Sequence, residues 1–262
     1  MSTPIYNTIG KAYNTTRCAD PYIADRIYEL LAPTKNGVYL DIGCGTANYL
    51  AALAKRGVSF YGVDPSETML EQAKAKDVDA TFIQARSESL PIEDEFFDGA
   101  MALFTLHHWG DKLAGLREVN RVLKPGARMV FLTFTGEQMR GYWLNEYFPV
   151  MMRRSWELVP ELPGMEQLLN DSGFRLAATE NYFVQDDLQD HFLYSNKRRP
   201  EQYLRPEIRQ NASSFSAFCE ADELASGLTA LEQDIATGKI NDIMKSYEND
   251  RGDYLFIVAE KT

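Results

Sequence analysis

Short apolar runs alternate with amphipathic stretches along the central part of the chain. Five runs rich in β-branched and aromatic side chains have the length of buried strands, and they span residues 38–42, 59–64, 80–84, 97–103 and 129–134. Between these runs apolar residues recur every three or four positions, as expected for helices over 66–74 and 111–122. Strands that alternate with helices predict an α/β fold with a mostly parallel sheet.

Two segments interrupt this alternation, and the first is residues 137–160. Four large apolar side chains recur there at every fourth position: Met139, Trp143, Tyr147 and Met151. This spacing predicts an apolar helical lid, bent at Pro149, in which Trp143 and Tyr147 form a wall of a substrate site. The same stripe could instead pack on the sheet.

The second interruption, residues 185–249, separates expected strands at 174–184 and 254–260 and is too long for a hairpin loop. It must therefore contain helices, one of which is marked by Leu224, Leu228, Leu231 and Ile235. A basic cluster precedes that helix: Lys197, Arg198, Arg199, Arg205 and Arg209. Such a cluster could receive an anionic substrate, or it could balance acidic residues at the surface.

Residues 1–35 precede the first strand and are predicted to form an N-terminal helical arm. Asp20 and Pro21 are a typical helix start, and Ile23 and Ile27 follow at helical spacing. We expect residues 36–262 to form one main domain that contains both helical insertions.

Composition narrows the possible partners of the chain. Of its 262 residues 45% are hydrophobic and 25% are charged, which is ordinary for a globular protein. The net charge of −11 would repel phosphate backbones, which argues against nucleic-acid targets.

No run approaches the roughly 20 apolar residues of a membrane span and the N-terminus lacks signal-peptide features, so we expect a cytoplasmic protein without a membrane partner. The three cysteines lack paired spacing for a metal, and we expect none.

The stretch VYLDIGCGTAN, residues 38–48, carries the strongest chemical signal. A buried strand ends at Ile42, and small residues then form a tight turn that opens a helix. Glycine at positions 43 and 45 permits positive φ and lets a ligand contact the backbone, while the helix start offers unpaired N–H groups. This loop predicts a site for a ligand with carboxylate or hydroxyl oxygens.

An acidic residue, Asp64, ends the second strand about 20 residues after the loop, where nucleotide-binding α/β folds place the carboxylate that binds ribose. Asn48 stands where a dinucleotide fingerprint has its third glycine, and its side chain would crowd a pyrophosphate. A nicotinamide oxidoreductase is therefore disfavoured, and a nucleoside without phosphates fits better.

These and later motifs together resemble a known family. The turn at residues 41–47, Asp64, the SLPI at 89–92, the FFDGAMALFTLHHW at 96–109 and the VLKPGARMVF at 122–131 follow the order seen in class I S-adenosylmethionine-dependent methyltransferases. The LHHW and LKPG stretches resemble the type 11 branch that includes quinone-biosynthesis and trans-aconitate methyltransferases. The resemblance covers roughly residues 36–135 and implies a Rossmann-like sheet of seven strands, the last one antiparallel.

The resemblance implies S-adenosylmethionine as cofactor and a set of residues that hold it: Asp41, Gly43, Gly45, Asp64, Pro65, Met69, Ser87, Glu88 and Phe104. Many members carry an acid shortly after the third strand, whereas this chain has Arg86, so Ser87 or the backbone is expected to bind the adenine. Met69 would face the adenine, although a methionine packed in the core is an equal alternative.

In the family the N-terminal arm often folds over the cofactor and closes the substrate site. Tyr13 and Arg17 are therefore expected to bind the substrate, with half-buried packing for the tyrosine and solvent exposure for the arginine as alternatives. His107 and His108 lie where a methyl acceptor would approach. Either could remove a proton from the acceptor near neutral pH, or it could only shape the pocket.

We therefore expect an enzyme that moves a methyl group to an O, N or activated C of a small-molecule acceptor, which could be anionic. The alternative is a non-catalytic protein that binds S-adenosylmethionine. The residues leave open the identity of the acceptor and the oligomeric state.

Overall fold

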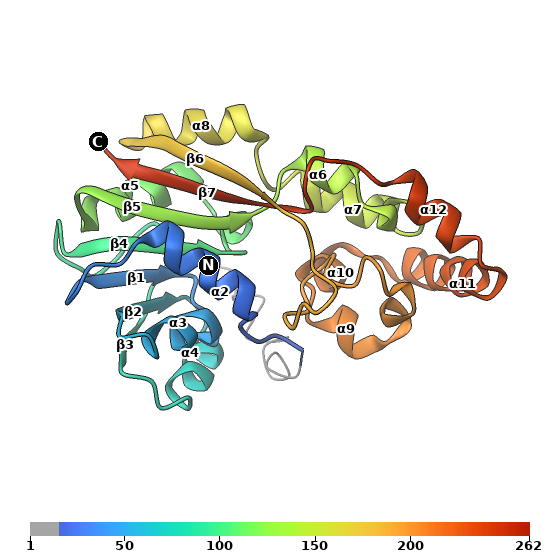
Figure 1. Cartoon of the computed structure of the whole chain (residues 1–262), viewed down its shortest axis with the longest axis horizontal. Helices are drawn as coiled ribbons and strands as arrows, with labels where there is room; N and C mark the ends of the chain where they lie inside the picture. The colour runs from blue at the N-terminus through green and yellow to red at the C-terminus, as the bar shows by residue number, and fades with distance from the viewer. Residues whose placement is uncertain (1–15) are drawn as a thin grey trace.

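One sheet of seven strands organises the computed structural model, which describes residues 16–262 (Figure 1). The strand order is β3-β2-β1-β4-β5-β7-β6. The strands are β1 (Val38–Ile42), β2 (Ser59–Asp64), β3 (Ala80–Gln84), β4 (Phe97–Leu103), β5 (Leu123–Thr133), β6 (Phe174–Tyr182) and β7 (Tyr254–Lys261). β7 runs antiparallel to both of its neighbours, β5 and β6, and the other described strand pairs are parallel, so the predicted sheet is confirmed.

Helices cover both faces of the sheet. One face carries α2 (Pro21–Leu31) and α3 (Asn48–Ala54), with α4 (Glu67–Lys74) beside β2 and β3, and the other face carries α5 (Lys112–Val122) and α8 (Leu162–Asp171). Successive strand residues serve opposite faces: Tyr39 belongs to the core under α2 and α3, and Leu40 to the core under α5 and α8. This alternation makes the central strands β1 and β4 largely buried on both sides, whereas the edge strand β3 is partly exposed.

The predicted helix of the N-terminal segment is confirmed. Asp20 caps it by accepting a hydrogen bond from the N–H of Ile23, and Pro21 is its first residue. Ile23 and Ile27 are fully buried, and the helix packs on β4 and β5. This part of the expected arm is therefore a layer of the fold, while Tyr13 lies outside the described residues.

The first insertion is not one bent helix. It consists of α6 (Gly136–Arg140), the 3-10 turn η3 (Trp143–Glu146) and α7 (Pro149–Trp156). Thr135 and Gln138 form a capping box at the start of α6, and Pro149 begins α7, so each short helix has its own start signal. All four residues of the apolar stripe are buried, so the stripe packs within the fold.

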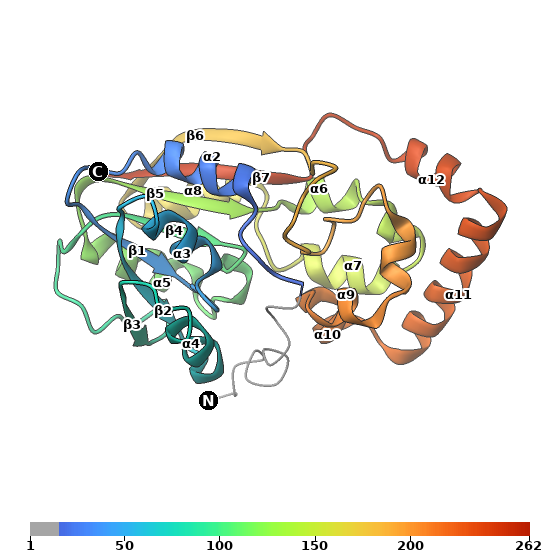
Figure 2. The same ribbon diagram turned by 60° about the horizontal axis from the view of Figure 1, so that its bottom comes forward.

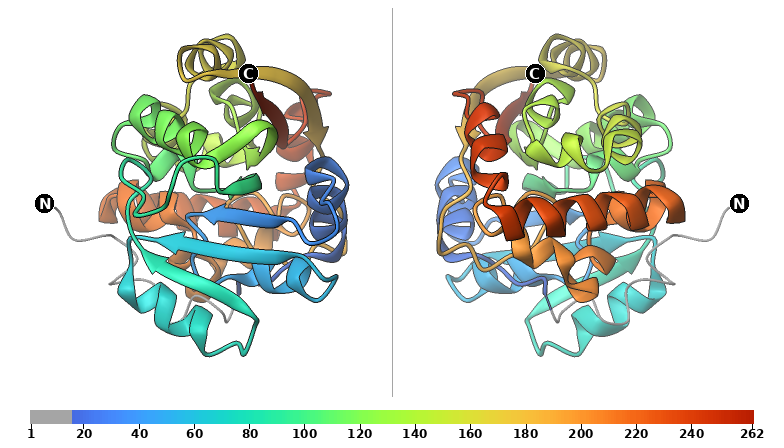
Figure 3. Two further views of the ribbon diagram at one scale, coloured as in Figure 1. Left: turned by 90° about the vertical axis from the view of Figure 1, so that its left-hand side faces the viewer. Right: turned by 90° about the vertical axis from the view of Figure 1, so that its right-hand side faces the viewer.

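The second insertion contains the 3-10 turn η4 (Pro200–Leu204) and the helices α9 (Pro206–Gln210), α10 (Ser213–Phe218), α11 (Ala221–Thr237) and α12 (Ile240–Ser246). The helix marked by the four apolar residues is α11, and it ends before Gly238, which has the left-handed conformation. Figures 1 and 2 show both insertions beyond the carboxyl ends of the parallel strands, and the right-hand view of Figure 3 looks onto their helices. Together they form a helical lobe at the edge where α/β folds bind ligands.

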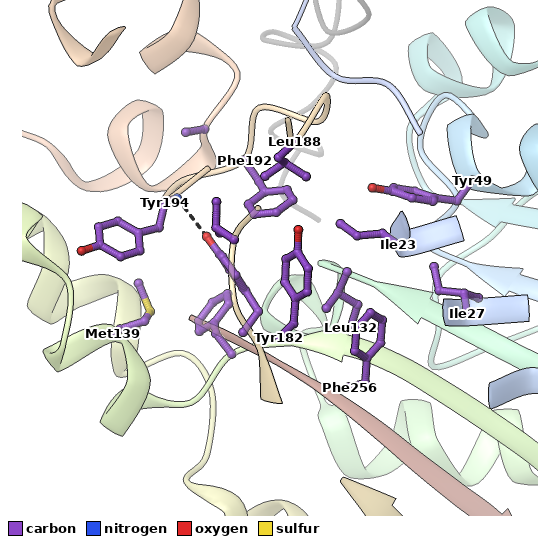
Figure 4. Close-up of a cluster of buried hydrophobic side chains, with 14 of the residues drawn as sticks. Ile23, Ile27, Tyr49, Leu132, Met139, Tyr182, Leu188, Phe192, Tyr194 and Phe256 are labelled. Atoms are coloured by element: carbon purple, nitrogen blue, oxygen red, sulfur yellow. Dashed lines mark hydrogen bonds between the residues drawn. The ribbon is translucent and has the colours of Figure 1, made fainter. Parts of the chain in front are cut away.

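An aromatic cluster joins this lobe to the sheet. In Figure 4, Leu188 and Phe192 of the second insertion lie beside Tyr182, near Leu132 and Phe256 of the strands. Tyr194 is tied to the start of β7, because its N–H donates to the hydroxyl of Tyr254 at 2.9 Å.

The basic cluster of the second insertion is mostly paired with acids. Ion pairs join Lys197 to Asp253, Arg198 to Asp186 and Arg205 to Glu207. These contacts match the alternative in which the cluster balances acidic residues. Within residues 16–262, no helix is long and apolar enough to cross a membrane.

Candidate active site

The loop after β1 has the geometry that its glycines predicted. Gly43 and Gly45 have φ values of +73° and +53°. A Cβ on Gly43 would lie 2.0 Å from Thr105 Oγ1, whereas a Cβ on Gly45 would have no atom of residues 16–262 within 4 Å. Packing and φ both require glycine at position 43. At position 45 only the left-handed φ favours glycine, and the space beside it is open to a ligand.

Asp64, at the end of β2, is bonded to this loop. Its Oδ2 accepts from the N–H of Gly45 at 2.9 Å, and its Oδ1 accepts from the N–H of Ser66 at 2.8 Å. Burial raises the pKa of this carboxyl above its usual value. Each carboxylate oxygen can accept a second hydrogen bond, so these contacts leave capacity for ligand hydroxyls.

Asp41, four residues before Gly45, lies next to this acid. Burial, and then the charge of Asp64, raise the pKa of Asp41 to about 8. Two carboxyl groups with raised pKa values therefore lie together in the part of the site that borders the glycine loop, and a bound cation would favour their ionised forms.

The glycine-loop pocket, as we name it, is a space of about 430 Å³ at this loop. It is lined by Arg17, Asp41, the residues 43–46, Asn48, Tyr49, Leu103, Phe104 and Asp190. Of these, Arg17, Asp41, Gly43, Gly45 and Phe104 were expected at the site.

The Glu88 pocket, as we name the neighbouring space of about 360 Å³, lies at the ends of β3 and β4 and also borders Gly43. Its walls include Pro65, Ser87, Glu88 and His108. Glu88 accepts hydrogen bonds from the N–H of Asp111 at 3.0 Å and from the hydroxyl of Ser87 at 3.0 Å. Burial opposes ionisation of Glu88, but these hydrogen bonds outweigh it and hold its pKa below the usual value.

Met69 is not brought to either pocket. It is 2% exposed in α4, and its N–H donates to the capping hydroxyl of Ser66 at 3.3 Å. The packing alternative therefore describes this residue.

The aromatic cavity, as we name the third space of about 560 Å³, lies between the sheet and the helical lobe. Its walls come from both insertions and from the ends of β4 and β5, and they are Arg17, Phe104, His107, Phe134, Met139, Tyr142, Ser155, Leu158, Phe192, Leu193, the residues 211–214, Phe218 and Tyr254. Phe104 and Arg17 line both this cavity and the glycine-loop pocket. These two side chains thus form a wall common to both spaces.

Phe104 is held in an unusual conformation at this boundary. Its φ is +52°, which is rare for a bulky residue, and its N–H donates to the carbonyl of Leu132 at 2.8 Å. The rings of Phe192 and Tyr254 lie 4.6 and 5.3 Å from its own. Strain of this kind persists where the surroundings fix it, which is common at ligand sites.

The two histidines are separated by the structure. His107 lines the aromatic cavity and His108 the Glu88 pocket, with ring centroids 3.9 Å apart. Burial lowers the pKa of both, that of His108 to about 4. Nδ1 of His107 has no hydrogen-bond partner within residues 16–262. Both imidazoles are therefore neutral at physiological pH and are weaker bases than expected.

Trp143 and Tyr147 do not line the aromatic cavity. Trp143 is 1% exposed, and its indole N–H donates to the carbonyl of Lys197 at 2.8 Å. The hydroxyl of Tyr147 donates to Asp234 at 3.0 Å. Both side chains join the two insertions to each other. The residues of the first insertion that line the cavity include Met139 and Tyr142, where Trp143 and Tyr147 were predicted.

Sequence reasoning did not select Tyr49, Asp190 or Asn211. Tyr49 directly follows the glycine loop, which is a signal that could have been used. The other two lie in the second insertion, where periodicity predicts helices but not which loop residues reach the sheet.

Comparison with known proteins decides the family. Residues 40–131 match the model of a methyltransferase domain. The chain is 30% identical over 180 residues to a demethylmenaquinone methyltransferase of Clavibacter sepedonicus, which is 64% of this chain and 73% of that protein. The chain belongs to the class I S-adenosylmethionine-dependent methyltransferases.

Two further relatives extend this result. A demethylmenaquinone methyltransferase of Corynebacterium kroppenstedtii is 31% identical over 136 residues, 50% of this chain and 58% of that protein. A crystal structure from Anabaena variabilis, described as a methyltransferase from an antibiotic biosynthesis pathway, superimposes with a TM-score of 0.83 at 31% identity and covers 94% of this chain and 99% of that one. This methyltransferase therefore shares both the sheet and the helical lobe with a solved protein. The matched domain, residues 40–131, contains neither insertion.

Proposed function

We propose that this methyltransferase binds S-adenosylmethionine across the glycine-loop and Glu88 pockets and methylates a small molecule held in the aromatic cavity. The observation that carries the proposal is the shared boundary at Phe104 and Arg17. A methyl group passes directly only between adjoining spaces, so we place the transfer beside these two shared side chains.

The residues of the two pockets fit the cofactor chemically, together with Asp64, which lines neither pocket but is bonded to Gly45 of the loop. Gly45 leaves open space beside the loop for the methionine end, and Asp64 can accept from the ribose hydroxyls. Pro65, Ser87 and Glu88 would surround the adenine. The donors and acceptors are thus suited to an uncharged nucleoside joined to an amino acid.

When bound, the cofactor supplies a methyl group on a sulfonium, a strong electrophile that a nucleophile displaces in line. The chain's own contribution is to align the acceptor and exclude water. Phe104, Phe134 and Phe192 provide apolar walls at the boundary. His107 is a neutral imidazole on the same wall and can accept a hydrogen bond, or a weakly held proton, from the attacking group. His108 lines the Glu88 pocket, so it would contact the cofactor and not the acceptor.

The cavity supports an acceptor with a ring and no net charge. Its walls are mainly aromatic and aliphatic, and hydroxyl and amide groups of Ser155, Asn211 and Ser214 could orient a polar substituent. A demethylated quinol is one candidate, since relatives at 30% and 31% identity are demethylmenaquinone methyltransferases. An anionic acceptor has weaker support, because three members of the basic cluster that suggested it pair with acids.

The proposal is tested with methyl-labelled S-adenosylmethionine and three acceptor classes: demethylated quinols, aliphatic carboxylic acids and transfer RNA. We expect label in the quinol class. The variant Leu158→Phe places a larger side chain in the wall of the aromatic cavity and leaves the glycine loop unaltered. It should therefore reduce methyl transfer and leave the affinity for S-adenosylhomocysteine unchanged. Binding of the cofactor without transfer to any small acceptor would instead support the non-catalytic alternative.

A further inference from the structure

A buried ion pair lies in the wall of the glycine-loop pocket. Asp190 is 1% exposed, and its Oδ1 accepts from Nε of Arg17 at 2.5 Å. Its Oδ2 accepts from Nη2 of Arg17 at 3.2 Å and from the hydroxyl of Tyr49 at 3.0 Å. The carboxylate is thus held by a two-point contact with a guanidinium and by one hydroxyl.

The three residues come from distant parts of the chain. Arg17 precedes α2, Tyr49 is in α3 and Asp190 belongs to the second insertion, yet all three line the glycine-loop pocket. Figure 4 shows Tyr49 extending from α3 towards Leu188 and Phe192 of the insertion. Of the three residues that close the pocket, only Tyr49 lies in the region that matches the family model, residues 40–131. Arg17 and Asp190 lie outside it.

Further contacts fix Arg17 and Asp190 in this position. The side-chain amide of Asn48 donates to the carbonyl of Arg17 at 3.1 Å. The N–H of Gln189, next to Asp190, donates to Asp20 at 3.1 Å, and the N–H of His191 donates to the carbonyl of Thr16 at 3.0 Å. Both partners of the ion pair are thus held on their backbones as well as by their side chains.

Packing alone does not account for such a pair. A buried ion pair is a weak source of stability, because removing both groups from water costs about as much as their attraction returns. Its place in a pocket wall points to a ligand. A guanidinium and a carboxylate side by side complement the carboxylate and the ammonium of an amino acid, and both can take further partners, since the guanidinium has five N–H donors and a carboxylate about four acceptor sites.

We propose that Arg17 and Asp190 together bind the zwitterionic methionine end of the cofactor, Arg17 at its carboxylate and Asp190 at its ammonium group, with Tyr49 as the positioning residue for Asp190. This inference rests on the cofactor site assigned under the proposed function. It gives Arg17 to the cofactor, although the residue also borders the acceptor cavity.

Binding measurements with four ligands test the proposal without requiring turnover. The ligands are S-adenosylhomocysteine, its analogue without the carboxylate, its analogue without the amine, and 5′-methylthioadenosine, which lacks the amino-acid end. Arg17→Ala should weaken only the two ligands that carry a carboxylate, and Asp190→Asn only the two that carry an amine. The expected loss is about 10- to 100-fold for each, typical of hydrogen bonds to charged groups.

Tyr49→Phe should reproduce the Asp190→Asn pattern more weakly. Tyr39→Phe is the matched control, because its hydroxyl accepts from the N–H of Thr34 at 2.7 Å, away from all three spaces, so it should change no affinity. Equal weakening of 5′-methylthioadenosine in the variants would show a general structural effect and overturn the proposal, as would unchanged affinities. Failure of the unaltered protein to bind S-adenosylhomocysteine would overturn the proposed function itself, which separates the two failures.

Discussion

The backbone N–H of Gly45 donates a hydrogen bond of 2.9 Å to Oδ2 of Asp64, which ties the loop after β1 to the end of β2. Asp64→Ala removes this acceptor together with the proposed partner of the ribose. We expect cofactor affinity to fall by an amount typical of charge-assisted hydrogen bonds, about 1.5–3 kcal/mol. Calorimetry with S-adenosylhomocysteine measures it, and Asp64→Asn, which keeps one acceptor oxygen, should lose less. Unchanged affinity in Asp64→Ala would reject the assignment.

Gly45 and Gly57 form a matched pair for testing the loop. Both have positive φ, +53° and +84°, and neither would place a Cβ within 4 Å of another described atom. Valine at either position should cost about 1–2 kcal/mol of folding free energy, because a side chain is unfavourable in the left-handed region. Only Gly45→Val should also lose cofactor binding, since only Gly45 borders a pocket. Similar melting temperatures with different affinities are the expected result, and normal binding by Gly45→Val would remove the loop from the cofactor site.

The raised pKa of Asp41, about 8, predicts that cofactor binding depends on pH. A cationic ligand favours the ionised carboxylate, so the protein must release a proton on binding at neutral pH. Affinity should therefore fall as pH decreases below about 8, by up to about tenfold per pH unit. Titrations at pH 6, 7 and 8 measure this slope, and Asp41→Asn should flatten it.

The same carboxyl group also affects the stability of the ligand-free protein, but in the opposite direction: cofactor affinity should rise with pH, whereas folding stability should fall. An unfolded chain ionises aspartate near pH 4, whereas the folded protein holds the proton of Asp41 up to about pH 8. This group therefore makes the folded state less stable as pH rises through that window. Asp41→Asn should raise the melting temperature at pH 8 relative to the unaltered protein. A lower melting temperature for that variant at pH 8 would contradict the protonated state of Asp41.

The histidines should not produce a step in activity near pH 6.5. Burial lowers the pKa of His107 and takes that of His108 to about 4, so both stay neutral between pH 6 and 8. Because a base of such low pKa is weak, we expect His107→Ala to lower the single-turnover rate by less than about 100-fold, the range of an orienting hydrogen bond. A loss larger than this, with a pH-dependent rate, would instead identify the residue as the base. Loss of cofactor affinity in both His107→Ala and His108→Ala would place the pair in the cofactor site.

Trp143 should matter for stability rather than for acceptor choice. Its ring is fully packed between the insertions, so Trp143→Ala should cost about 3–5 kcal/mol in denaturant unfolding. Relative rates on different acceptors should remain as in the unaltered enzyme. A changed order of acceptor preference would return Trp143 to the cavity wall.

The predicted strands β1 to β4 matched the structure because their signals are local, whereas β5 begins at Leu123, before the predicted run at 129–134. The bounds of β1, β2, β3 and β4 follow directly from apolar runs that end in Asp, Gln or a turn. The lid was a different case: the spacing of Met139 and Trp143 is that of a helix, yet the chain turns at Gly141 and buries both side chains. The spacing of apolar residues does not reveal which part of the chain they pack against. Here that part is the second insertion.

The site residues likewise divide into those that local sequence predicts and those that it does not. The glycine loop and Asp64 could be predicted because they lie within one strand-loop-helix unit and the strand after it. The pairing of Arg17 with Asp190 joins residues 173 positions apart, and no spacing rule connects them. Contacts of this kind arise only when the sheet has brought the N-terminal segment and the lobe together.

The second insertion leaves the sheet and returns to it at a single point, since Tyr182 at the end of β6 pairs with Tyr254 at the start of β7. Its two ends therefore lie side by side, as at the junction of a grafted domain, and closing a longer or shorter loop between them changes the entropic cost only slowly with length. The helices of this insertion, α9 to α12, can accordingly be exchanged as a block while strand register is preserved. On such a scaffold, new acceptor preferences can evolve by replacement of these helices, while Asp190, which precedes them, and the rest of the proposed donor site stay the same.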